Sequence, residues 1–260
     1  MKTKSFRLLA VTAALGITAF PSFAAEARKA LPKLVMLVSE AEYETAKTLP
    51  EFATNQLAKD FRVVIVNGSP APNENAFTGI AEVADADVLL ISVRRRTPPT
   101  AQLEAIRRHI KAGKPVVGIR TASHAFVLGK GQKLSEGGAD WLTWDHDVIG
   151  GNYSNHHGRG TGATTVTLSA GASAAHPILR GVKLPITSES TLYKNTPLQP
   201  GAQSLLTGTI DNQPAEPLAW TFQRPDGGRS FYVSLGGPND FKDPEFVKLL
   251  RNALLWAAGK

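Results

Sequence analysis

The sequence predicts an α/β protein whose sheet is mainly parallel, with antiparallel strands added in the second half of the chain. The first observation is that short apolar runs alternate with amphipathic segments between residues 34 and 119. This alternation is typical of right-handed strand–helix–strand units, which build parallel sheets. The second observation is that the later apolar runs follow one another without helices between them. Strands joined without a helix favour antiparallel pairing.

The first half supplies the predicted parallel strands and their helices. The strands cover residues 34–38, 61–67, 87–93 and 115–119. Residues 48–59 and 100–112 repeat apolar side chains at helical spacing, so both are predicted helices, and residues 80–84 form a shorter one. His109 is expected on the exposed face of the second of these helices.

The second half is predicted to hold short strands and one terminal helix. The strands cover residues 164–168, 191–193, 204–207, 217–222 and 230–235. Residues 130–147 are rich in glycine and are expected to be a long loop beside the site. Residues 175–181 are predicted to turn into a short helical piece. Asp243 is expected to cap a final helix that starts at Pro244 and ends at Ala258.

The sheet is predicted to end in a polar turn after residue 119. Arg120, Thr121, Ser123 and His124 follow that strand directly, and residues 125–128 are expected to begin a helix. Ligands bind at the carboxyl edge of open α/β sheets, so this polar turn is the first candidate site. The alternative is structural, with Ser123 capping the helix and His124 packing against the sheet.

The amino terminus has the pattern of a secretory signal peptide. Lys2, Lys4 and Arg7 precede an apolar stretch that ends in small residues, so residues 1–24 are predicted to be removed near Ala24. We therefore expect a periplasmic or secreted protein in which residues 25–260 form a single domain. The apolar stretch is too short for a stable membrane span, so no membrane insertion is expected.

Charge and composition exclude several classes of function. The formal net charge is +7, and three of the positive charges belong to the predicted signal peptide. The basic residues form no stripe with interleaved aromatic side chains, so no nucleic acid partner is expected. The chain has no cysteine, which excludes disulfides and a cysteine nucleophile.

Several stretches, taken in order, carry a family resemblance. They are residues 114–126 (KPVVGIRTASHAF), 150–157 (GGNYSNHH), 176–181 (HPILRG), 192–193, 216–220, 228–236 and 244–256. This ordered set resembles the ThuA-like (trehalose utilisation) family and covers nearly all of the chain after residue 24. The resemblance implies a fold similar to the class I glutamine amidotransferases, a flavodoxin-like three-layer sandwich, and a role in carbohydrate utilisation.

The resemblance also limits the chemistry. In the amidotransferases the strand-to-helix turn holds a nucleophilic cysteine, and here Arg120 stands at about that place. Arginine stays protonated and cannot act as an acyl-transfer nucleophile, so glutamine amidotransferase activity is excluded. Many family members carry an acidic pair where this chain has Ser190 and Thr191, with Glu189 close but shifted. Many also carry a histidine where this chain has Gly237.

The candidate catalytic residues are His124, His156, His157 and Arg120. Histidine can act as an acid, a base or a metal ligand near neutral pH. His156 and His157 are adjacent in a loop, so only one of them is expected to face the pocket, and His156 is preferred.

A metal site would need three convergent ligands. Glu40, Glu42 or Asp145 could join two of the histidines, but no spacing motif supports this. We therefore predict no metal and no cofactor.

The candidate substrate-binding residues follow other strands of the sheet. They are Glu40, Tyr43, Arg95, Arg96, Ser123, Trp144 and Asn239. An arginine of the 94–96 run could bind a carboxylate, a phosphate or a sugar hydroxyl pair, although a solvated charge run is the alternative. Trp144 could stack on a sugar face, although a core position is the alternative.

Two functions remain open from the sequence. The first is an exported protein that acts on a sugar or glycoside derivative, with a histidine moving a proton and Arg120 holding an oxyanion. The second is a non-catalytic carbohydrate-binding or accessory module. Both expect a small-molecule or glycan ligand.

Overall fold

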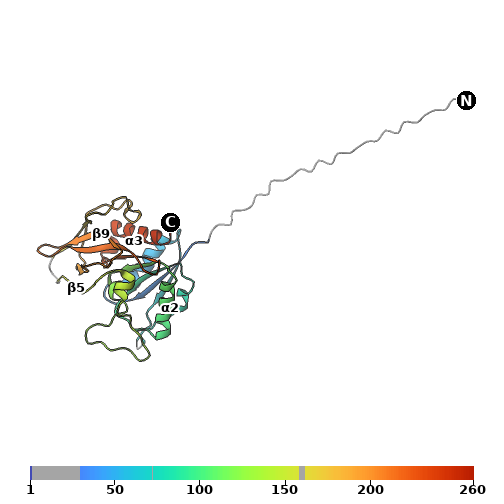
Figure 1. The fold of residues 1–260 in the computed structure, drawn as a ribbon, viewed down its shortest axis with the longest axis horizontal. Coiled ribbons are helices and arrows are strands. Elements are labelled where there is room, and N and C mark those ends of the chain that lie inside the picture. Colours follow the sequence, from blue (N-terminus) through green and yellow to red (C-terminus); the bar gives the residue numbers. More distant parts are fainter. Residues whose placement is uncertain (2–29, 72, 158–161) are drawn as a thin grey trace. The chain divides into compact units, whose positions relative to one another are not determined.

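The computed structural model describes residues 1, 30–71, 73–157 and 162–260. Residues 31–260 form one compact unit (Figure 1). The predicted signal peptide falls outside the described residues apart from Met1. Within the described part of the chain, no helix is both long and apolar enough to cross a membrane.

One half of the main sheet is parallel. Its strands are β1 (Lys33–Ser39), β2 (Arg62–Asn67), β3 (Val88–Val93), β4 (Val116–Ile119) and β11 (Arg229–Val233). They lie side by side in the order β2-β1-β3-β4-β11. All their carboxyl ends therefore meet at one edge of the sheet. The sequence predicts this arrangement for β1, β2, β3 and β4.

Antiparallel strands extend the sheet beyond β11. They are β10 (Glu216–Gln223), β9 (Ala202–Thr209), β6 (Thr164–Leu168) and β7 (Ile186–Ser188), in that order. A separate antiparallel pair joins β5 (Asn155–His156) to β8 (Tyr193–Lys194). The mixed sheet confirms the predicted fold class.

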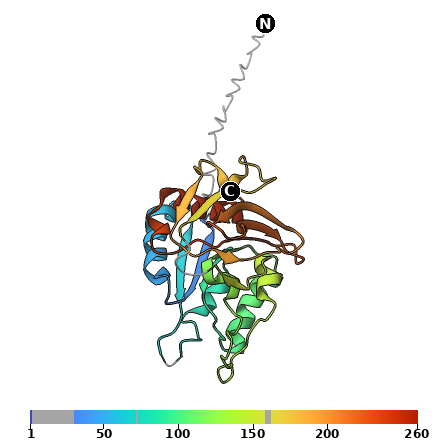
Figure 2. The same cartoon turned by 90° about the vertical axis from the view of Figure 1, so that its left-hand side faces the viewer.

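Helices cover both faces of the sheet. On one face lie α1 (Thr45–Phe52), a π-helical extension η1 (Ala53–Leu57) and α3 (Pro244–Ala257), and on the other lies α2 (Thr100–Lys111) (Figures 1 and 2). The alternation of side chains along β1 divides the core accordingly. Leu34, Met36 and Val38 pack with α1 and α3, whereas Val35 and Leu37 pack with α2. The result is a three-layer sandwich.

Short 3₁₀ and π turns complete the architecture. They are η2 (Ile80–Val83), η3 (Arg120–His124), η4 (Asp145–Ile149), η5 (Pro177–Leu179) and η6 (Asp240–Lys242). η2 and η5 agree with the helical pieces predicted near residues 80 and 177. Asp243 caps α3 as predicted, and its carboxylate accepts the Glu245 backbone N–H at 2.7 Å.

Two predicted elements differ from the structure. No helix begins at residues 125–128, because the carbonyls of Ala125 and Phe126 accept hydrogen bonds from Arg96 N and Trp141 N at 2.8 Å each. The strand expected at residues 191–193 starts only at Tyr193. The carbonyl and the hydroxyl of Thr191 accept hydrogen bonds from the Arg120 side chain instead of pairing with a strand.

The structure also corrects the prediction for His109, which is buried and only 4% exposed. His109 lies in the last turn of α2, and the chain returns at once into β4. The Pro115 carbonyl therefore meets the ring, at 3.2 Å from Nε2. Burial lowers the pKa of His109 to about 4, and the nearby charges of Lys114 and Arg224 add to this effect.

His109 should make the fold sensitive to acid. Its folded pKa of about 4 lies below the ordinary value of 6.5, so its stabilising contribution is present above pH 6.5 and is lost as the pH falls to 4. The loss amounts to roughly 3 kcal/mol. We expect His109→Phe to flatten the dependence of the unfolding free energy on pH in this window, measured by urea denaturation. Lys59→Gln, which removes an exposed charge, should leave the slope unchanged, and equal slopes in all three proteins would contradict the argument.

Candidate functional site

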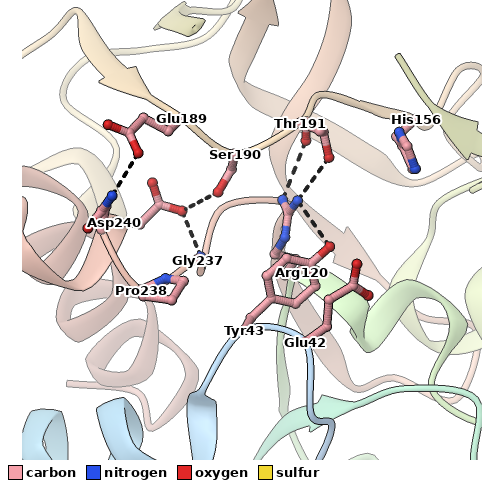
Figure 3. A pocket seen from close by; sticks show the side chains of 11 residues that line it. Glu42, Tyr43, Arg120, His156, Glu189, Ser190, Thr191, Gly237, Pro238 and Asp240 are labelled. Carbon is pink, nitrogen blue, oxygen red and sulfur yellow. Dashed lines mark hydrogen bonds between the residues drawn. The ribbon is translucent and has the colours of Figure 1, made fainter. Parts of the chain in front are cut away.

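The carboxyl edge of the sheet holds a pocket of about 440 Å³ (Figure 3). Three of its walls follow parallel strands: residues 42–43 follow β1, Arg120 follows β4, and residues 237–240 follow β11. Residues 189–191, which precede β8, and His156 in β5 complete the lining. The pocket thus lies where open α/β sheets bind ligands.

The backbone of Arg120 is held in an unusual conformation. Its φ of 42° lies in the left-handed region, which costs about 1 kcal/mol or more for a residue with a side chain. The Tyr232 hydroxyl donates a 2.5 Å hydrogen bond to the Arg120 carbonyl. This bond fixes the sharp turn at the end of β4 and aims the side chain across the carboxyl edge.

The guanidinium of Arg120 is buried among uncharged oxygens. Nη1 donates to the carbonyl of Ser234 at 2.7 Å and to that of Thr191 at 3.4 Å. Nη2 donates to the Thr191 hydroxyl at 3.0 Å and to the Tyr43 hydroxyl at 3.4 Å. The Tyr43 and Tyr193 rings lie 4.2 and 4.7 Å from its central carbon. Burial by itself would lower the pKa of Arg120, but the neighbouring tyrosines raise it above its ordinary value.

Carboxylates stand on both sides of this cation (Figure 3). Glu42 lies on the Tyr43 side and pairs with Arg94 at 3.0 Å. Glu189 lies on the other side and accepts a 2.7 Å hydrogen bond from the Asn239 amide. Glu42 and Glu189 thus give the pocket acceptors for hydroxyl hydrogens on both sides of one buried positive charge.

The three candidate histidines occupy different environments. His156 is half-buried and lines the pocket, with its Nδ1 2.8 Å from the His157 carbonyl and its ring 6.4 Å from that of Tyr193. His157 is buried away from the pocket, with Nδ1 2.8 Å from Gln213 and Nε2 3.8 Å from Glu216. His157 thus fastens its loop to the strands beside it.

His124 is buried and is not part of the pocket lining. Its ring stacks on Tyr153 at 4.4 Å between centroids, and its Nδ1 lies 3.0 Å from the Ser123 hydroxyl. Burial, reinforced by Arg95 and Arg94, lowers the pKa of His124 to about 3. The ring is therefore neutral near pH 7 and is a weak base.

Comparison with known protein families covers nearly all of the folded part of the chain. A family model described as ThuA, trehalose utilisation, matches residues 34–257. The chain belongs to the ThuA family. A search of curated proteins found no match.

Solved structures share the fold of this ThuA-family chain. A protein described as ThuA-like from Bacteroides uniformis is 17% identical with a TM-score of 0.62, covering 92% of this chain and 95% of that one. Another described as ThuA-like, from Parabacteroides merdae, is 15% identical with a TM-score of 0.57 over 89% and 91%. The N-terminal domain of mmIFT52 is 10% identical with a TM-score of 0.54 over 88% and 98%. At these identities the likeness concerns the fold alone, and it agrees with the flavodoxin-like sandwich predicted.

Several predicted ligand-binding residues of this ThuA-family chain hold the fold together beside the pocket. Glu40 is buried and accepts the backbone N–H groups of residues 42, 43 and 45 at 2.7–2.9 Å, so its carboxylate caps α1. Arg96 donates to the Ser39 hydroxyl at 2.8 Å. Arg95 reaches the Val127 carbonyl at 3.4 Å. None of these three lines the pocket.

Trp144 and Ser123 are also interior residues. Trp144 is completely buried, its indole N–H donates to the Ala122 carbonyl at 2.6 Å, and the Phe126 ring meets it edge-on. Protein atoms therefore cover the indole that could have stacked on a sugar. Ser123 is 1% exposed and contacts the Arg120 carbonyl at 3.4 Å.

The pocket thus unites four of the predicted catalytic or substrate-binding residues with others that were not predicted in those roles. The predicted members are Tyr43, Arg120, His156 and Asn239. The additional polar members are Glu42, Glu189, Ser190, Thr191 and Asp240. Residues 189–191 stand where the family pattern changes, and that departure was the one available signal. Within the described residues, no three His, Asp or Glu side chains are grouped so that they could hold a metal ion.

Proposed function

We propose that this ThuA-family protein is exported, binds a sugar or glycoside derivative in the pocket at the carboxyl edge and acts on it in carbohydrate utilisation. The observation that carries the proposal is the pocket's chemistry. Carboxylates on opposite sides can accept hydroxyl hydrogens, while Tyr43, Ser190 and Asn239 can bond further hydroxyls. A polyhydroxyl ligand matches such a lining, and the family's description as trehalose utilisation supports the same ligand class.

The state of Arg120 favours an uncharged sugar over a sugar acid or phosphate. Its four terminal N–H bonds all have protein acceptors, so it has no open fork for a carboxylate or phosphate. An anionic ligand would also approach Glu189 and Asp240. The two bonds of 3.4 Å, to Thr191 O and the Tyr43 hydroxyl, are the weak ones. An oxyanion that forms on the sugar could replace them.

The proton in such a reaction would be moved by His156. It lines the pocket, whereas His124 and His157 do not. His124 has a pKa of about 3 and would stay neutral. Its stacking on Tyr153 fits a structural role outside the pocket lining. Arg120 stands in place of a nucleophile, so glutamine amidotransferase activity is not part of the proposal.

A second candidate is a carbohydrate-binding or accessory module without turnover. The observation that favours it is that, of the histidines in the described part of the chain, His156 alone lines the pocket, so no second histidine there can serve as its acid or base partner. Product formation from a bound sugar separates the two candidates, because a binding module would show saturable stabilisation alone.

The test is a thermal-shift panel on the exported protein, with its amino terminus determined by sequencing. The panel contains trehalose, glucose, oxidised sugars, glucuronate and glucose 6-phosphate, with and without divalent metals. A ligand at 100 times its Kd stabilises by about 2.7 kcal/mol, which raises Tm by roughly 5–10 °C for a domain of this size. We expect such a shift with neutral sugars and little with the two anions.

Variants locate the effect. Glu189→Gln should weaken neutral-sugar binding about tenfold, because hydrogen bonds to a charged acceptor are the stronger ones. Glu136→Gln removes an exposed carboxylate outside the pocket and should bind like the wild type. His156→Ala should keep binding and lose any turnover. A panel without any shift, or a shift that Glu189→Gln and Glu136→Gln leave equally intact, would overturn the sugar-binding proposal.

A further inference from the structure

Asp240 is a buried carboxylate with an unusual number of donors. It is 5% exposed, at the start of η6. One oxygen accepts from the Ser188 hydroxyl at 2.5 Å. The other accepts from the Ser190 hydroxyl and from the backbone N–H groups of Gly236 and Gly237, each at 2.8 Å. All of these donors are uncharged, so the carboxylate is held by directed hydrogen bonds.

These donors belong to two segments that are distant in the sequence. Gly236 and Gly237 follow β11, whereas Ser188 ends β7 and Ser190 leads toward β8. Asp240 therefore joins the loop after β11 to the segment before β8. Figure 3 shows the carboxylate between Ser190 on one side and Gly237 on the other.

The same two segments hold the guanidinium of Arg120. The segment before β8 supplies both oxygens of Thr191, next to Ser190. The end of β11 supplies the Ser234 carbonyl, two residues before Gly236. Three of the four bonds to the guanidinium thus come from the segments that Asp240 joins.

The fit between these segments leaves no spare room. A Cβ atom at residue 237 would lie 2.8 Å from the Ser190 hydroxyl oxygen, closer than real Cβ atoms come. Gly236 has a φ of 131°, a conformation that side chains disfavour. Two glycines therefore let the backbone approach Asp240 and present both N–H groups to it.

We propose that Asp240 is a positioning residue, which sets the place of the Arg120 guanidinium in the pocket by joining the two segments that bind it. Asp240 acts through Ser190 and Gly236–Gly237 and does not contact Arg120 itself. The inference rests on the proposed function, because it takes this pocket to be the ligand-binding site. Its test needs no ligand, so it can fail while the sugar-binding proposal stands.

The reporter is the Nε–H of Arg120, observed by proton–nitrogen NMR. This nitrogen is buried and has no hydrogen-bond partner among the described residues, and the rings of Tyr43 and Tyr193 flank the guanidinium. Its resonance should therefore be shifted by the rings and protected from exchange with solvent. Its absence in Arg120→Lys assigns it.

The test compares Asp240→Ala with Asp243→Ala in the full chain without ligand. Asp243 is a matched carboxylate three residues away, whose side chain caps α3; its backbone N–H bonds the Asp240 carbonyl, and the alanine variant keeps that bond. We expect Asp240→Ala to move the Arg120 resonance and to speed its exchange about tenfold or more, because the local opening becomes easier. Asp243→Ala should lower the melting temperature, because it removes the cap of α3, and should leave the resonance in place.

Two further variants keep the proposal falsifiable if Asp240→Ala does not fold. Ser190→Ala removes one of the four bonds and should shift the resonance in the same direction by less. Asp240→Asn can keep its oxygen toward the glycine N–H groups and turn its amide toward Ser188, so it should stay closer to the wild type than the alanine variant. An unmoved resonance in folded Asp240→Ala, or in Ser190→Ala where Asp240→Ala does not fold, would overturn the proposal. An equal shift in Asp243→Ala would do the same.

Discussion

Replacing Arg224 with methionine is expected to lower the unfolding free energy by roughly 3–5 kcal/mol, since removing one partner of a buried charged network leaves the others unsatisfied. Arg224 is 2% exposed. Its Nη2 donates to the Lys114 carbonyl at 2.8 Å, and its Nη1 donates to the Arg229 carbonyl at 3.1 Å and the Ser230 hydroxyl at 3.0 Å. Its Nε donates to Asp226 at 3.0 Å.

The position of Arg224 explains why the loss should be large. Lys114 and Arg229 lie at the amino ends of β4 and β11, two parallel neighbours in the middle of the sheet. A Cβ atom at Gly228 would lie 1.9 Å from the Arg224 guanidinium, so only glycine leaves room for this side chain in the turn. Methionine fills much of the volume and cannot reach those carbonyls.

Urea denaturation and thermal melting provide the measurement. For a domain of this size each kcal/mol corresponds to about 2–4 °C in Tm, so a fall of roughly 10 °C is expected. Arg108→Met, at an exposed arginine of α2, is the control and should change stability by less than about 0.5 kcal/mol. Equal Tm values for Arg224→Met and Arg108→Met would mean that the hydrogen bonds of Arg224 contribute nothing to the stability of the fold.

Arg224 and Arg120 stand at opposite ends of the same strands. Arg224 binds the amino ends of β4 and β11, whereas Arg120 follows the carboxyl end of β4 and bonds to Ser234 just after β11. The first arginine meets its charge partner Asp226, and among the described residues the hydrogen-bond partners of the second are uncharged oxygens, with aromatic rings beside them. This difference fits a structural role for Arg224 and supports the role in ligand binding that we propose for Arg120.

The sequence was sufficient for the elements that are apolar throughout. Every residue of β1 is buried, and such a strand can be recognised without knowing its neighbours. The short strands β5, β7 and β8 have two or three residues each, and no periodicity can appear over that length. They form because other parts of the chain hold them, and this information is absent from the local sequence.

The site was predictable only where it follows a strand. Tyr43, Arg120 and Asn239 follow β1, β4 and β11, so the rule about the carboxyl edge found them. Glu189 follows an edge strand of the antiparallel half and reaches the pocket because residues 189–191 fold back onto Arg120, across 71 residues of sequence.

Trp144 and His109 were predicted to be accessible because of their residue types, and both are buried. The indole N–H of Trp144 finds the Ala122 carbonyl inside the fold, and Nε2 of His109 finds the Pro115 carbonyl, while its Nδ1 has no partner among the described residues. Once its polar atom is bonded, an aromatic ring gains more from burial than from exposure. Composition alone does not reveal whether such a carbonyl is within reach.

Replacing Asp145 with asparagine is expected to change how stability depends on pH. Asp145 is 9% exposed; one of its oxygens accepts the Tyr153 N–H at 2.6 Å, and the other is buried without a partner among the described residues. Burial raises the pKa of Asp145 from 3.8 to about 7, against the weaker opposing effects of the Tyr153 bond and His146. A carboxyl with a raised pKa contributes stability below pH 3.8, and that stability is lost as the pH rises to 7.

Asparagine cannot ionise, so it escapes this loss. The difference in unfolding free energy between Asp145→Asn and the wild type should move in favour of the variant by about 1.4 kcal/mol per pH unit between pH 4 and 7, roughly 4 kcal/mol in all, and should stay level above pH 7. Using the difference cancels the contributions of His109 and His124, which both proteins share. Urea denaturation at pH 4, 5.5, 7 and 8.5 measures it, with Asp211→Asn in the exposed β9–β10 turn as the control for net charge. A difference that stays constant with pH would mean that Asp145 ionises in the folded chain as easily as in water, despite a buried oxygen that has no hydrogen-bond partner among the described residues.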